Sequence, residues 1–246
     1  MSFVLRLLAV LCLAPALALA QADYAREKRL AEEIIPAIDV GDAVWLELKS
    51  GRKFLAIHTP NAKAAASVVV VHGMGLHPDW GLINVLRTRL AEQRYTTLSV
   101  QMPVLAADAR GEEYAPLLAE ADERLAAGVA FLRGRGSKKV AIVSHSMGTL
   151  MTDHFLVSAG TVRIDAWVAI GLSGEFTPLA VFKAPVLDLY GEKDYPAFVG
   201  ARERAAAIMQ VRGSAQAKIA GADHFFTDME DQLVRRVRLF LDSRLR

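Results

Sequence analysis

The sequence predicts an α/β protein with a mostly parallel central sheet flanked by helices. Two observations lead to this prediction. Short apolar runs, typical of buried strands, alternate with longer segments of helical pattern over most of the chain. The run SVVVV at residues 67–71 is apolar at consecutive positions, as expected of a parallel strand covered on both faces. Reactive groups in such sheets gather at the carboxyl ends of the strands, so functional residues are expected there.

The elements are expected in the following order. A polar helix covers about residues 23–35 and ends at Pro36, which cannot continue it. A hairpin follows around Ser50-Gly51, with strands at 44–48 and 53–58. The alternating part then has strands at 67–71, 97–100, 140–143, 167–171, 185–190 and 217–220 and helices at 80–93, 115–134, 147–159, 197–210 and 229–244.

Residues 1–20, MSFVLRLLAVLCLAPALALA, have the pattern of a secretory signal peptide. Arg6 precedes an apolar stretch, and Ala18 and Ala20 form an A-x-A end. A membrane anchor is the alternative, but the apolar run 7–20 is shorter than the ~20 residues that span a bilayer, and Pro15 interrupts it.

Cleavage is therefore expected after Ala20 or Ala22, which gives an exported protein, periplasmic or secreted, with no stable membrane span. The only cysteine, Cys12, lies in the signal segment, so the remaining chain must be stabilised by its core. Residues 21–246 show no repeat or linker and are expected to form a single domain. The formal net charge of +2 argues against nucleic acid as a partner.

The segment VAIVSHSMGTLM, residues 140–151, has the pattern of a strand, a tight turn and a helix. A nucleophile elbow needs this geometry, because it exposes a serine hydroxyl beside the helix amino terminus. Small residues must stand two before and two after the serine, and Ser144 and Gly148 flank Ser146 in this way. Ser146 is therefore the candidate nucleophile. An ordinary strand-turn-helix junction is the alternative.

The segment His72-Gly73-Met74-Gly75 follows the strand at 67–71. Acyl transfer passes through an oxyanion, which two backbone N–H groups can stabilise. The N–H groups of Met147 and Met74 are the candidate donors. Neither a third dinucleotide-binding glycine nor a Gly-Lys-Ser/Thr sequence follows, so a phosphate-binding loop is excluded. His72 ends a buried strand and is interpreted as a structural residue that ties the loop to backbone.

A serine nucleophile needs a base, and His224 is the candidate among six histidines. It follows a strand, in the loop before the last helix. His145 is next to Ser146, so its side chain is expected to point elsewhere.

The base in turn needs a carboxylate that holds its tautomer. Asp194 follows a strand and gives the chain order Ser, Asp, His. Asp188, inside the strand, is the main rival, and Glu192 and Asp223 are weaker ones.

The series HGMG…LHPDW…TLSVQMP…SHSMG…LDLYGEKDYPA…GADHFF resembles the α/β-hydrolase superfamily, in a bacterial exported branch known mainly as a domain of unknown function. The resemblance covers about residue 40 to the end. It implies the α/β-hydrolase fold and a hydrolase-like triad, without a settled substrate. Ser144, where the usual G-x-S-x-G pattern has its first glycine, is the one departure.

Residues 174–184 leave too little chain for a large cap domain, so an open site is expected. Met74, Trp80 and Phe176 are candidate apolar lining residues. Such a site suits a small-molecule ester or thioester substrate. No metal-binding spacing such as His-Glu-x-x-His is present, so no metal and no cofactor are expected.

The last helix, 229–244, has an apolar face with Leu233, Val237 and Leu241, and arginines elsewhere on its surface. Packing of this face on the sheet is the preferred interpretation, and contact with anionic lipid is the alternative.

The sequence therefore predicts an exported serine hydrolase, a carboxylic ester hydrolase with a Ser-His-Asp triad and an acyl-enzyme intermediate. The alternative is a non-catalytic binding protein that keeps the same fold. Esterase, thioesterase, lipase and peptidase share this machinery, and the sequence does not choose among them.

Overall fold

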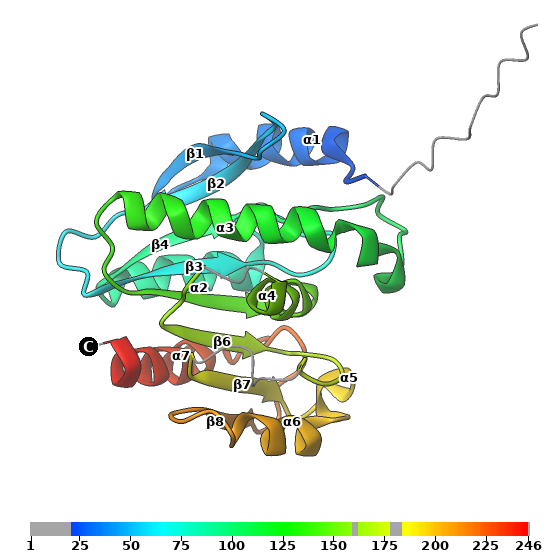
Figure 1. The fold of residues 1–246 in the computed structure, drawn as a ribbon, viewed down its shortest axis with the longest axis vertical. Coiled ribbons are helices and arrows are strands. Elements are labelled where there is room, and N and C mark those ends of the chain that lie inside the picture. Colours follow the sequence, from blue (N-terminus) through cyan, green and yellow to red (C-terminus); the bar gives the residue numbers. More distant parts are fainter. Residues whose placement is uncertain (1–20, 159–161, 178–183, 246) are drawn as a thin grey trace, which may run out of the picture.

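A computed structural model describes residues 21–158, 162–177 and 184–245. Its described strands form one sheet in the order β1-β2-β4-β3-β5-β6-β7-β8 (Figure 1). β1 and β2 form an antiparallel hairpin, and β2 is also antiparallel to β4. All other neighbouring strands are parallel. The predicted fold class, a mostly parallel sheet with flanking helices, is confirmed.

The strands are β1 (Asp42–Glu47), β2 (Lys53–Thr59), β3 (Ala66–Val71), β4 (Tyr95–Val100), β5 (Val140–His145), β6 (Ala166–Ile170), β7 (Val186–Gly191) and β8 (Ala215–Ile219). The α-helices of the described residues are α1 (Tyr24–Ile34), α2 (Gly81–Glu92), α3 (Leu118–Gly134), α4 (Met147–Ser158), α5 (Tyr195–Phe198), α6 (Ala201–Ile208) and α7 (Glu230–Leu245). Two short 3₁₀ helices, Ile35–Ala37 and Gly111–Leu117, precede Ile38 and α3.

The central strand β3 explains why the sheet is covered on both faces. All six of its residues are buried. Val69 and Val71 pack into one apolar cluster together with residues of α3 and α4, while Val68 and Val70 pack into a second cluster with residues of α2 and α7. The alternation of side chains along a strand divides the valine run between these two layers, which Figure 1 shows in front of and behind the sheet.

The helix predicted at 197–210 is wrong in its extent, because the chain forms two helices there. α5 ends at Phe198, and α6 begins at Ala201. Gly200 between them has φ of 84°, a left-handed conformation that interrupts an α-helix and that glycine adopts without strain. The break lets the short α5 stay beside the end of β7.

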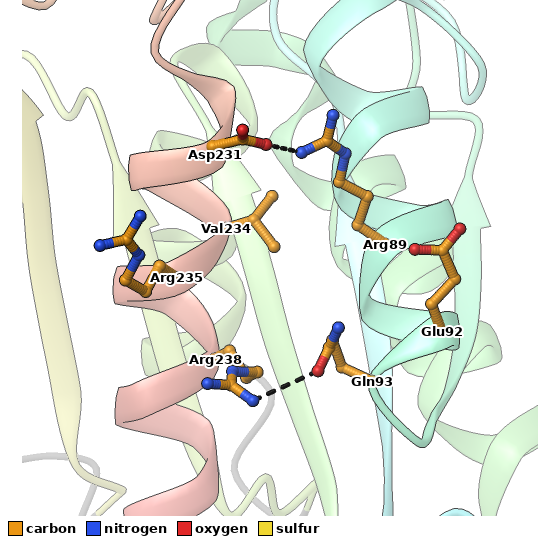
Figure 2. Close-up of a pocket in the computed structure, with 7 residues that line it drawn as sticks. All are labelled: Arg89, Glu92, Gln93, Asp231, Val234, Arg235 and Arg238. Atoms are coloured by element: carbon orange, nitrogen blue, oxygen red, sulfur yellow. Dashed lines mark hydrogen bonds and ion pairs between the residues drawn. The ribbon is translucent and has the colours of Figure 1, made fainter.

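The last helix, α7, packs its apolar face onto the sheet, as the preferred interpretation of the sequence has it. Leu233, Val237 and Leu241 are fully buried. On its solvent side, Asp231 forms an ion pair with Arg89 of α2, and Arg238 donates a 3.2 Å hydrogen bond to Gln93 (Figure 2). These contacts border a surface cavity of about 390 Å³ between the two helices.

The predicted signal peptide, residues 1–20, lies outside the described residues. Residues 178–183 of the segment 174–184, which is expected to be too short for a large cap domain, also lie outside them. Within the described ranges, the helices are too short or too polar to cross a membrane.

Candidate active site

Ser146 lies at a sharp turn between β5 and α4. It has φ of 56°, a left-handed conformation that is uncommon for a residue with a side chain and that is often found at functional sites. Its N–H donates to the carbonyl of Ile170 at 2.9 Å, which ties the turn to β6. A Cβ atom at Gly148 would lie only 2.3 Å from the carbonyl oxygen of His72. The turn therefore needs glycine at this position so that α4 can start close to the end of β3.

Ser144 replaces the glycine that usually precedes such a turn, and its hydroxyl is fully buried below the site. The hydroxyl accepts a 2.9 Å hydrogen bond from the indole Nε1–H of Trp167 and donates a 3.4 Å bond to the carbonyl of Val168. The extra side chain is bonded to β6 and leaves Ser146 accessible to His224.

His224 connects the other two predicted residues. Its Nδ1 lies 2.8 Å from Oδ2 of Asp194, and its Nε2 lies 3.0 Å from Oγ of Ser146. A carboxylate oxygen accepts hydrogen bonds, so the proton lies on Nδ1 and Nε2 is free to accept the hydroxyl proton. Three residues that are far apart in sequence thus form one hydrogen-bonded chain at the carboxyl edge of the sheet, the right-hand side in Figure 1.

Asp194 is placed by the turn after β7, and its side chain is fully buried. Its Oδ1 also accepts a 3.4 Å bond from the N–H of Ala197 and so caps the amino terminus of α5. Two glycines make room for the His224–Asp194 pair. A Cβ at Gly171 would lie 3.2 Å from both Asp194 Oδ2 and His224 Cε1, and a Cβ at Gly191 would lie 2.5 Å from the carbonyl oxygen of Asp223. Glycines at the ends of β6 and β7 are the sequence signal that could have located this close approach.

The loop after β3 runs directly beside Ser146. A Cβ at Gly73 would lie 3.1 Å from the Cβ of Ser146. The carbonyl of Gly73 accepts a 2.8 Å bond from Nδ1 of His72. In a trans peptide the N–H points opposite to the carbonyl, so this bond also fixes the direction of the Met74 N–H. The other predicted donor, Met147, begins α4, and the first N–H groups of a helix have no acceptor within the helix.

His72 is the structural residue that the sequence indicates. Its Nε2 accepts a 2.9 Å bond from the N–H of Met102, so its two nitrogens join the loops after β3 and β4. Burial lowers the pKa of His72 to about 3. The ring is therefore neutral at ordinary pH, and its Nδ1–H is available to hold the Gly73 carbonyl.

His145 is not bonded to Ser146, in line with the expectation that its side chain points elsewhere, but its ring stays beside the site. It packs against the ring of His224, with 4.7 Å between ring centroids. Its Nε2 donates a 2.9 Å bond to the backbone carbonyl of His224. Burial, followed by the nearby His224, lowers the pKa of His145 to about 4. The contact joins residues 79 positions apart, which adjacency to Ser146 could not reveal.

The rival carboxylates have other partners. Asp188 is fully buried and accepts bonds from Arg204 at 2.9 Å and Gln216 at 2.8 Å. Glu192 pairs with Lys218 at 2.8 Å on the surface. Asp223 accepts the N–H group of Thr227 and that of Phe225, and these bonds lower the pKa of its carboxyl. In the described part of the chain, Asp194 is therefore the one of these four carboxylates that contacts the His224 ring.

Apolar side chains border the site. Met74 is 43% exposed, and the rings of Trp80 and Phe225 pack edge to face with 5.1 Å between centroids. Phe225 also contacts the ring of His224. The expectation for Phe176 is wrong, because this side chain is buried against Trp167.

In the part of the chain that the structure describes, no group of three or more His, Cys, Asp or Glu side chains is arranged to hold a metal ion.

A parallel sheet with a serine turn, a histidine and a carboxylate at its carboxyl edge defines the architecture of an α/β hydrolase. The family model described as "Alpha/beta hydrolase family" matches residues 68–244, and the chain belongs to this family. No curated protein sequence matches the chain.

Solved structures share the fold. A dienelactone hydrolase from Anabaena variabilis is 19% identical with a TM-score of 0.66, and the alignment covers 83% of this chain and 97% of that one. An esterase from Pyrococcus furiosus is 15% identical with a TM-score of 0.65, covering 83% and 93%. An α/β serine hydrolase without lid from Xanthomonas campestris is 14% identical with a TM-score of 0.61, covering 85% and 96%.

Proposed function

We propose that this protein is an exported serine hydrolase that cleaves carboxylic esters through Ser146, His224 and Asp194. The observation that carries the proposal is the continuous chain of contacts from Asp194 Oδ2 through both nitrogens of His224 to Ser146 Oγ, at 2.8 and 3.0 Å. Nucleophile, base and orienting carboxylate must lie within hydrogen-bond distance for this chemistry.

In the proposed reaction, the Ser146 hydroxyl attacks the ester carbonyl while His224 Nε2 accepts its proton. Asp194 keeps the ring in the required tautomer and stabilises its cation. The N–H groups of Met147 and Met74 stabilise the oxyanion. The protonated His224 then gives its proton to the leaving alcohol, which forms an acyl-enzyme, and a water molecule activated by His224 releases the acid.

A small-molecule ester or thioester is the proposed substrate. The apolar Met74, Trp80 and Phe225 beside the site suit an apolar acyl or alcohol group. The esterase from Pyrococcus furiosus and the lid-free serine hydrolase from Xanthomonas campestris share the fold at low identity, which is consistent with this class of reaction.

Export is proposed from the sequence of residues 1–20, with residues 21–246 as the folded domain. Expression of the full chain with a carboxyl-terminal tag, followed by cell fractionation and amino-terminal sequencing, tests it. A shortened chain that begins at Gln21 or Asp23 outside the cytoplasm is expected, and an uncleaved cytoplasmic chain would contradict export.

The catalytic proposal is tested with a fluorophosphonate probe and p-nitrophenyl esters, using residues 21–246 and the variants Ser146→Ala and His224→Ala. Loss of either triad member is expected to lower kcat by about 10⁴- to 10⁶-fold and to abolish labelling. Circular dichroism checks that each variant is folded.

Folded protein that neither reacts with the probe nor hydrolyses any ester would contradict the proposal. It would favour the non-catalytic binding protein that the altered elbow first suggested.

A further inference from the structure

Arg26, in the first turn of α1, connects two loops at the carboxyl edge of the sheet. Its Nη2 donates a 3.0 Å bond to the carbonyl of Gly75, and its Nη1 donates a 2.5 Å bond to the carbonyl of Leu105. Gly75 follows β3, and Leu105 follows β4. α1 precedes residues 68–244, so this contact comes from outside the segment that matches the family.

The contact with Gly75 acts on the turn that contains Met74. The N–H of Leu76 donates a 3.4 Å bond to the carbonyl of Gly73 and closes the turn Gly73-Met74-Gly75-Leu76. Gly75 has φ of 69° at its third position, where a type II turn needs glycine. The Gly75 carbonyl and the Leu76 N–H belong to one planar peptide, so the bond from Arg26 fixes the direction of the N–H that closes the turn.

Arg26 is held in place by its own helix. Asp23 caps α1 by accepting the N–H of Arg26 at 2.8 Å, and the Asp23 N–H donates to the carbonyl of Val104 at 2.7 Å. Glu27 accepts the N–H of Val104 at 3.3 Å and pairs with the buried Arg124 at 3.0 Å. The first turn of α1 is therefore anchored to the loop after β4 on both sides of Arg26. The backbone of Arg26 is thus fixed, and its guanidinium is held by the two carbonyls that it joins.

We propose that Arg26 is a positioning residue for the turn at Gly73–Leu76, which presents the Met74 N–H to the oxyanion. This inference rests on the proposed function, because it needs Met74 to stabilise charge during ester cleavage. His72 fixes one end of the turn from inside the protein, and Arg26 fixes the other end from α1. The amino-terminal helix is thus part of the catalytic apparatus, although it contributes no group to the reaction.

The experiment compares Arg26→Met with Arg29→Met, a matched change at an exposed position on the same helix. Hydrolysis of p-nitrophenyl butyrate is expected to lose about 10- to 100-fold in kcat in Arg26→Met, with KM within about twofold, because a displaced donor weakens transition-state binding. Arg29→Met is expected to match the unchanged protein. Arg26→Lys, which keeps one charged donor, is expected to recover part of the kcat.

A second measurement separates positioning from loss of folding. An alkylboronic acid forms a tetrahedral adduct with a serine nucleophile and places an oxygen at the oxyanion position. Its affinity is expected to fall in Arg26→Met in parallel with kcat/KM, while KM stays constant. The fraction of folded protein is measured by circular dichroism, so that rates refer to folded molecules.

The inference is overturned if Arg26→Met and Arg29→Met have the same kcat per folded molecule, or if boronic acid affinity is unchanged. Ser146→Ala identifies a failure of the proposed function instead. If that variant keeps the esterase activity, the hydrolase proposal and this inference both fail. If activity depends on Ser146 but not on Arg26, only the positioning role is wrong.

Discussion

Two buried aspartates lie close together in sequence, one in β7 and one in the turn after it, and they pair with different kinds of basic side chain. Asp188, inside β7, pairs with Arg204, whereas Asp194, just past the end of β7, pairs with His224. Arginine keeps its charge at every ordinary pH, so the Asp188 pair is permanent. An imidazole can accept a proton at one nitrogen and release one from the other, so the Asp194 pair can take part in proton transfer. Burial alone therefore does not identify the carboxylate that orients the histidine. The side chain that the carboxylate pairs with does identify it.

The two pairs also differ in their connections. Arg204 donates to the carbonyls of Ala197 and Gly174 as well as to Asp188, so it joins α5 and α6 to the sheet. Burial raises the pKa of the Asp188 carboxyl, and the Arg204 guanidinium opposes that increase. The Asp188 pair therefore stabilises β7 and α5, the two elements on either side of Asp194.

Neutralising each aspartate in turn separates the two roles. Asp194→Asn is expected to lower kcat by about 10³- to 10⁴-fold, because His224 loses the partner that sets its tautomer. Asp188→Asn leaves a buried guanidinium without its counter-ion and is expected to cost about 3–5 kcal/mol of unfolding free energy. Ester hydrolysis and urea unfolding of both variants measure the two effects.

The two roles are wrongly assigned if Asp188→Asn loses more activity per folded molecule than Asp194→Asn does. That result would make Asp188 the acid. The double variant Asp188→Asn/Arg204→Met is the control. It removes both charges and is expected to restore part of the stability that Asp188→Asn loses.

The free energy of unfolding is also expected to depend on pH, because the site contains buried histidines that are neutral in the folded protein. Burial lowers the pKa of His145 to about 4, so between about pH 4 and its usual value near 6.5 the unfolded chain binds the extra proton. The contribution of the neutral His145 to the unfolding free energy is therefore fully present above about pH 6.5 and decreases as the pH falls towards 4. Urea midpoints across this range measure the effect.

His145→Gln is the matched variant for this pH dependence. It removes one titrating group and is expected to flatten the decrease in unfolding free energy, although His72 continues to contribute. An unchanged slope in His145→Gln would show that the buried His145 ring does not cause the dependence.

The smallest expected effect concerns the altered elbow. Ser144→Ala removes the bond that the hydroxyl accepts from Trp167 and the bond that it donates to Val168, and is expected to cost about 1 kcal/mol of unfolding free energy. kcat is expected to stay within about twofold, since the hydroxyl is bonded to Trp167 and Val168 and not to the triad. A large loss of kcat without a loss of stability would instead give Ser144 a role in the reaction.

The sequence predicts the sheet well because the buried strands are continuous apolar runs, which their burial requires. The serine, aspartate and histidine are found from their positions after strands and from their chain order, and the structure brings all three into contact. Their catalytic roles remain predictions.

Other features depend on tertiary contacts or on a single backbone angle. His145 reaches His224 only because the loop after β8 folds over the end of β5. The break in the helix at 197–210 depends on the left-handed Gly200, which a helical apolar pattern does not reveal. Arg26 is one of many charges on a polar helix, and its carbonyl partners become neighbours only in the assembled sheet.

The long sequence separation within the site has a consequence for folding. Ser146 and His224 are 78 residues apart, and between them the chain forms β6, β7 and β8. Contacts between distant residues require closure of large loops, so they form late and slowly. During refolding, ester hydrolysis is expected to recover after helical circular dichroism, which makes enzymatic turnover a direct kinetic reporter of completion of the β5–β8 half of the sheet.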